Sequence, residues 1–160
     1  ANPLINITLQ GRHDTYPKRR GMTRVPELMA AGVNVAFGHD CVMDPWYSLG
    51  SGDMLEVAHM GLHVAQMTSQ TGMRQCFDAV TVNAAKVMGL TGYGIEAGQD
   101  ASFVLLQARD AVEAIRLRAT RLKVWRKGGL LAQTAPSPAQ LSLPGRPGST
   151  AFMPAQAAGD

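Results

Sequence analysis

The sequence has little of what marks several large classes of protein. Only two of its 160 residues are cysteines, Cys41 and Cys76, so neither a disulfide framework nor a Cys-x-x-Cys zinc site is indicated. No apolar run approaches the roughly 20 residues of a membrane span, and no basic, apolar leader opens the chain. We therefore expect a cytoplasmic globular protein with reduced thiols and no membrane partner.

Charge of one sign is also scarce. The 15 Lys and Arg residues oppose 12 Asp and Glu residues, and a net charge of +3 is too small to argue for a nucleic-acid partner. The basic run over residues 116–127 is interrupted by apolar residues, which is typical of a solvated strand face. No nucleotide-binding glycine loop and no Gly-x-Ser-x-Gly motif occurs. Nucleotide-binding and serine-hydrolase functions are therefore not indicated.

The apolar pattern predicts an α/β protein. Residues 4–9 and 33–38 are apolar, partly β-branched runs typical of buried strands, and a short helix capped by Thr23 separates them. A strand, a helix and a strand in this order form a βαβ unit. Further helices are predicted over residues 53–67 and 72–88.

Beyond residue 92 the pattern becomes extended. Residues 102–106 are predicted to form a strand. A hairpin is predicted around two glycines, with its strands over residues 117–125 and 130–132. Residues 135–160 are rich in Pro and Ala and poor in aromatic residues, which predicts a disordered tail. The chain is thus divided into residues 1–92, 93–134 and 135–160.

Asp40 is the first candidate for chemistry, because it stands at the carboxyl end of a predicted buried strand. In parallel α/β sheets and barrels, side chains at this end face the active site. A carboxylate there can bind a metal ion or accept a proton, although Asp40 can equally cap the next turn. The neighbouring His39 is interpreted as a structural residue, and His59 and His63 as a hydrogen-bonded pair on a buried helix.

Residues 2–16, NPLINITLQGRHDTY, and the following segment through GHDCVMDPWYSLG resemble the C-terminal part of bacterial cytosine deaminase, of the amidohydrolase superfamily. The resemblance covers most of residues 2–134. It implies the last two βα units of a (β/α)₈ barrel within residues 1–92 and part of a small flanking β-sandwich within residues 93–134. It also implies hydrolytic deamination of cytosine to uracil and ammonia, and a homo-oligomer for the full-length protein.

By the same resemblance, Asp40 is the catalytic aspartate that binds Fe²⁺ or Zn²⁺. Trp46 matches an aromatic residue near the pyrimidine pocket, and Cys41 and Met43 occupy positions on the pocket side. The best-known members carry Asp and Phe at the positions of Cys41 and Met43. Because of these two differences, the resemblance implies the reaction class but does not specify the substrate.

The family's other metal ligands have no counterpart in these 160 residues, and they are expected upstream of the first one. Because a catalytic metal needs about three protein ligands, we expect the isolated chain to be inactive. We also expect it to fold poorly, because two parallel strands alone expose edges and apolar faces that the other barrel strands would cover. Two alternatives stay open. One is a related amidohydrolase acting on creatinine, isoguanine or a triazine, and the other is a non-catalytic oligomerising or anion-binding module.

Overall fold

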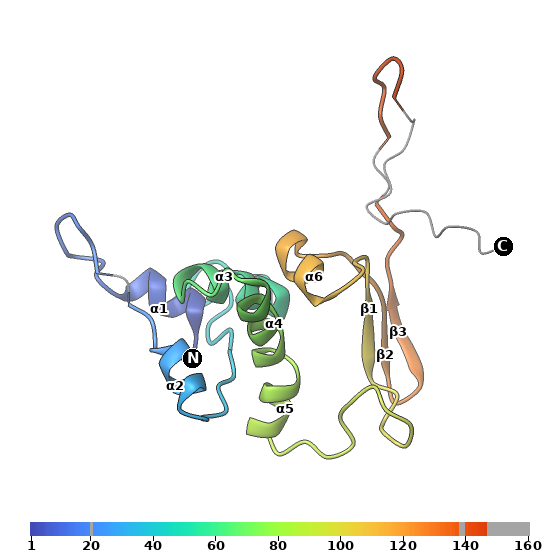
Figure 1. The fold of residues 1–160 in the computed structure, drawn as a ribbon, viewed down its shortest axis with the longest axis horizontal. Coiled ribbons are helices and arrows are strands. Elements are labelled where there is room, and N and C mark those ends of the chain that lie inside the picture. The colour runs from blue at the N-terminus through green and yellow to red at the C-terminus, as the bar shows by residue number, and fades with distance from the viewer. Residues whose placement is uncertain (20, 138–139, 147–160) are drawn as a thin grey trace.

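The computed structural model describes residues 1–19, 21–137 and 140–146 as a helical part beside a small sheet (Figure 1). The elements in chain order are α1 (Pro3–Leu9), α2 (Val25–Ala30), α3 (Met54–Val64), α4 (Gln70–Ala79), α5 (Val82–Val87), β1 (Phe103–Leu106), α6 (Ala111–Leu117), β2 (Arg121–Arg126) and β3 (Gly129–Gln133). Among the described residues, none of these helices is long and apolar enough to cross a membrane. Most of the predicted tail lies outside the described residues, at 138–139 and 147–160.

The predicted strand over residues 4–9 is wrong, because these residues form α1. Pro3 occupies the first turn, where its fixed φ suits a helix and its missing N–H costs no hydrogen bond. Leu4 and Ile5 are buried, and α1 packs against α3. The Thr8 hydroxyl donates to the Leu4 carbonyl at 2.7 Å, a bond that a strand would not permit. Helical packing here outweighs the strand preference of the β-branched residues.

The predicted strand over residues 33–38 is not a regular strand in the described part of the chain, but its backbone is paired at one point. The amino group of Ala1 donates to the Ala36 carbonyl at 2.8 Å, and the Gly38 N–H donates to the Ala1 carbonyl at 2.9 Å. This alternation is the bonding pattern of parallel strands. The pairing stops at once because Pro3 begins α1, which leaves no second strand to extend the ladder.

The predicted helix over residues 53–67 is confirmed in substance as α3, whereas the helix predicted over residues 72–88 is two helices. The carbonyl of Ala79 accepts the Phe37 N–H at 2.9 Å and is diverted from the helical ladder, so α4 ends and α5 begins after Thr81. α2 is also present, with Arg24 rather than Thr23 at its N-cap. The largest fully buried side chains include Val25, Val57, Cys76 and Ile115.

The last part is a three-stranded antiparallel sheet in the order β1-β2-β3. Its hairpin between β2 and β3 confirms the glycine-turn prediction, with Arg126 opposite Gly129. The sequence did not predict α6, which follows β1 and precedes β2 along the chain. This helix contacts α3 and α4 (Figure 1). Because Ile115 of α6 is fully buried in the main core, α6 joins the sheet to the helical part. The fold is thus mixed α/β.

Candidate active site

The segment over residues 35–40 places its side chains alternately on two sides. Val35, Phe37 and His39 are buried in or against the helical core, with 6%, 3% and 9% of their surface exposed. Ala36 and Gly38, which lie between them, are partly exposed, and Asp40 is exposed. Period-two alternation is the property of an extended chain. Asp40 therefore lies at the exposed end of this extended segment.

The Asp40 carboxylate is held by a residue from the start of the chain. The Asn2 side-chain amide Nδ2 donates to Asp40 Oδ2 at 2.9 Å, and the Cys41 thiol lies 3.6 Å from Asp40 Oδ1. The backbone of Asp40 has a φ of +69°, in the left-handed region that non-glycine residues rarely occupy. Such conformations occur at functional sites when the surrounding structure enforces them.

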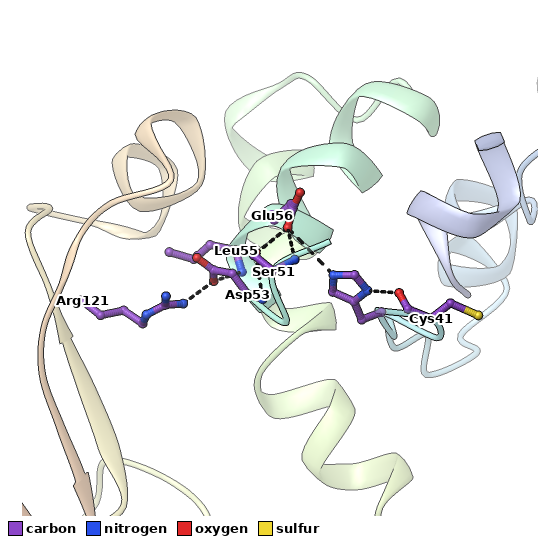
Figure 2. Close-up of polar contacts among 7 residues, drawn as sticks. Cys41, Ser51, Asp53, Leu55, Glu56 and Arg121 are labelled. Atoms are coloured by element: carbon purple, nitrogen blue, oxygen red, sulfur yellow. Dashed lines mark hydrogen bonds and ion pairs between the residues drawn. The ribbon is translucent and has the colours of Figure 1, made fainter. Parts of the chain in front are cut away.

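His39 fixes the turn that carries Asp40. Its ring is buried, with Nδ1 placed to donate to the Cys41 carbonyl at 2.8 Å. This contact is what a structural histidine would make, but it satisfies only one of the two ring nitrogens. The opposite nitrogen, Nε2, lies 3.9 Å from Glu56 Oε2 and has no hydrogen-bond partner among the described residues. Glu56 Oε2 in turn accepts from the Ser51 hydroxyl at 2.6 Å, as Figure 2 shows.

A second ion pair links this region to the sheet. Asp53 caps α3 by accepting the Leu55 N–H at 2.9 Å, and its Oδ1 pairs with Arg121 of β2 at 2.8 Å (Figure 2). The cap and the ion pair fix the N-terminal turn of α3, which also carries Glu56. The turn with Asp40, the helix α3 and the strand β2 are therefore connected through side chains.

The loop after Asp40 is folded around one carboxylate. Asp44 Oδ1 accepts the backbone N–H groups of Trp46 and Tyr47, both at 2.9 Å, and these bonds, the one from Tyr47 first, lower the pKa of Asp44. Tyr47 is buried and anchors the loop. Met43 and Trp46 remain 78% and 73% exposed. The loop thus presents two large apolar side chains to the outside.

The candidate Cys41 is close to Asp40 but is a poor nucleophile. Desolvation, with the carboxylates of Asp44 and Asp40, raises the pKa of the Cys41 thiol to about 11. With this pKa the Cys41 thiol is protonated near neutral pH. It is a poor nucleophile because only the thiolate attacks electrophiles. Of the predicted site residues, the structure therefore brings Cys41 into contact with Asp40 and leaves Met43 and Trp46 on the neighbouring loop.

The residues of this chain do not form a complete metal site. Within the described ranges, no group of three His, Cys, Asp or Glu side chains is placed to hold an ion. Asp40 supplies one carboxylate. The rings of His59 and His63 lie 4.6 Å apart, and each Nδ1 faces a backbone carbonyl, of Ile115 and His59 respectively, so both rings are hydrogen-bonded as expected, although His63 is exposed rather than buried.

Two residues of the site escaped sequence reasoning. Asn2 and Glu56 contact the Asp40 turn from far along the chain, and no local pattern identifies either contact.

A local signal for α6 was present in the sequence. Asp110 and Glu113 have the spacing of a capping box, and Asp110 Oδ1 accepts the Glu113 N–H at 2.8 Å.

The chain belongs to the amidohydrolase family, which it matches over residues 1–132. A pterin deaminase from Rhizobium rhizogenes is 33% identical over 140 residues, which cover 85% of this chain and 31% of that protein. This family membership confirms the resemblance to amidohydrolases.

Solved structures of the family have the same fold. The 5-methylcytosine deaminase from Klebsiella pneumoniae liganded with 5-fluorocytosine matches with a TM-score of 0.83 and 40% identity, over 88% of this chain and 34% of that one. An N-isopropylammelide isopropylaminohydrolase from Burkholderia multivorans matches with a TM-score of 0.68 and 33% identity, over 71% and 29%. The chain thus spans about a third of the length of these relatives.

Proposed function

We propose that this chain supplies the last barrel strand and the substrate-side loop of a metal-dependent amidohydrolase that deaminates cytosine or a close pyrimidine. The observation that carries the proposal is the placement of Asp40. It ends the alternating segment, is exposed and has a left-handed backbone. The 40% identity to a 5-methylcytosine deaminase favours a pyrimidine over the substrates of the other relatives.

The backbone supports assigning residues 33–38 to the closing strand of a barrel. Its single parallel contact, with Ala1, has the geometry of neighbouring barrel strands. A parallel backbone contact that involves a single residue on one side cannot close a barrel. The proposal therefore requires the other strands, and the other metal ligands, to come from outside these 160 residues.

Asp40 has two roles in the proposed reaction. One carboxylate oxygen would hold Fe²⁺ or Zn²⁺ together with ligands from outside these residues, and the carboxylate would accept the proton that the attacking water loses and pass it to the leaving amine. A divalent ion of this type lowers the pKa of a bound water to about 7.

The loop over residues 41–50 is proposed to line the pyrimidine pocket. Trp46 is largely exposed, so its indole face is available to stack on a flat ring. Met43, on the same loop, is exposed as well and offers a flexible apolar surface. Cys41 borders Asp40. We propose that these three residues set the substrate preference.

The proposal is tested by joining this chain to the part of the Klebsiella deaminase that it does not match. Ammonia release is measured with cytosine, 5-methylcytosine, creatinine, isoguanine and a triazine, for the chimera and for the isolated chain. We expect turnover of a pyrimidine by the chimera and none by the isolated chain. Asp40→Ala should lower kcat by about 10²- to 10⁴-fold, the usual contribution of an acid–base residue.

Asn34→Ala is the matched control, because Asn34 lies in the same segment and bonds the Asn83 carbonyl away from Asp40. It should leave turnover unchanged. A folded, metal-containing chimera in which Asp40→Ala retains full activity would refute the role of Asp40. Turnover of creatinine, isoguanine or the triazine alone would replace the pyrimidine with that substrate class.

A further inference from the structure

We infer that Asn2 is a positioning residue that holds the Asp40 carboxylate through Oδ2 and leaves Oδ1 to face the ligand. The inference rests on the proposed function. Asn2 Nδ2 donates to Asp40 Oδ2 at 2.9 Å, although the two residues are far apart in the sequence. Among the residues that the structure describes, the contact on Oδ1 is the Cys41 thiol at 3.6 Å, a weak donor that a stronger ligand can displace.

The side chain of Asn2 does not cap α1, although Asn2 is the N-cap residue of that helix. Asn2 is the N-cap of α1, and an asparagine at that position usually accepts a backbone N–H from the first helical turn. The structure shows no such capping bond from the Asn2 side chain. The amide is instead turned toward Asp40. The Asn2 side chain thus makes its hydrogen bond through Nδ2 to the Asp40 carboxylate rather than through Oδ1 to the helix.

Gly38 leaves the space that this contact needs. A Cβ atom at Gly38 would lie 2.7 Å from Asn2 Oδ1, closer than real Cβ atoms approach an oxygen. The backbone of Gly38 is also held by its N–H, which donates to the Ala1 carbonyl at 2.9 Å. The Asn2 amide is therefore fixed between the backbone of Gly38 and the side chain of Asp40.

The consequence is that the two Asp40 oxygens are not equivalent. A carboxylate on an exposed turn can otherwise rotate, and it then offers either oxygen to a metal ion or a proton. A hydrogen bond to a charged acceptor is about twice as strong as a neutral one and restricts this rotation. Outer partners that orient a metal-binding carboxylate typically change affinity or activity by about 10- to 100-fold when removed.

The contact is tested first without activity, in the full 160-residue chain. Hydrogen exchange of the side-chain amides is measured by NMR for the native chain and for Asp40→Ala. We expect the Asn2 amide protons to exchange about tenfold faster in Asp40→Ala, because they lose a charged acceptor. The Asn34 amide bonds a distant backbone carbonyl and should be unchanged, which makes it the internal control. Equal exchange of the Asn2 amide in both proteins would overturn the inference.

The positioning role is tested with Asn2→Ser in the chimera. Serine caps helices as well as asparagine does but cannot reach Asp40, so the helix is preserved while the contact is lost. We expect kcat to fall by about 10- to 100-fold with KM and Tm unchanged. A structural role predicts full activity for Asn2→Ser, and that result would overturn the inference. Failure of the proposed function would appear differently, as an Asp40→Ala chimera that is still active.

Discussion

Gly50 is the point at which the turn of Asp40 is most sensitive to a single methyl group. Its φ is +87°, and a Cβ there would lie 2.4 Å from His39 Cε1 and 2.9 Å from Nε2. An L-residue in the left-handed region costs about 1–2 kcal/mol. Displacing the buried ring also loses its hydrogen bond to the Cys41 carbonyl, about 1 kcal/mol. We expect Gly50→Ala to destabilise the chain by about 2–3 kcal/mol in urea denaturation followed by circular dichroism.

Gly52 provides the matched control for this prediction. Its φ is +71°, yet a Cβ there would meet no atom within 4 Å, so Gly52→Ala pays only the conformational cost of about 1–2 kcal/mol. In a His39→Ala background both clashes with the His39 ring are gone and only Tyr47 Cε1, at 3.2 Å, remains close to the new Cβ, so Gly50→Ala should cost little more than Gly52→Ala does. Equal losses for Gly50→Ala and Gly52→Ala in the native background would refute the reasoning.

The elements that were predictable from the sequence are those that local signals determine. The apolar stripes of α3 and the paired glycines between β2 and β3 each specify their element without distant contacts. The run over residues 4–9 contains β-branched residues and reads as a strand, but Pro3 and packing on α3 make it a helix. In that segment a tertiary contact outweighed local propensity.

Of the candidate site, the sequence could propose only Asp40, because it follows a buried apolar run, which is a local feature. The contacts that orient it, from Asn2 to its carboxylate and from His39 to the Cys41 carbonyl, need the folded chain. The same holds for Arg121, which pairs with Asp53 although the sequence placed it in a solvated basic run. Pairings across such separations leave no periodic signal in the chain.

Two further predictions concern the titration of the loop beside Asp40. Burial and two carboxylates raise the pKa of Cys41 to about 11, so iodoacetamide at pH 8 should alkylate it about a hundredfold more slowly in the folded chain than in urea, where thiols titrate near 8.5; comparable rates would contradict the assigned environment. The Tyr47 N–H lowers the pKa of Asp44, so its carboxylate stabilises the fold above its ordinary value near 3.9 and this stabilisation is lost as the pH falls through the lower folded value. Asp44→Asn should therefore unfold at lower urea concentration at pH 7, and its midpoint should change less between pH 5 and about 3 than that of the native chain. Because an asparagine oxygen still accepts the two backbone N–H groups but carries no charge, parallel pH profiles for the two proteins would show that the charge of Asp44 does not hold the loop.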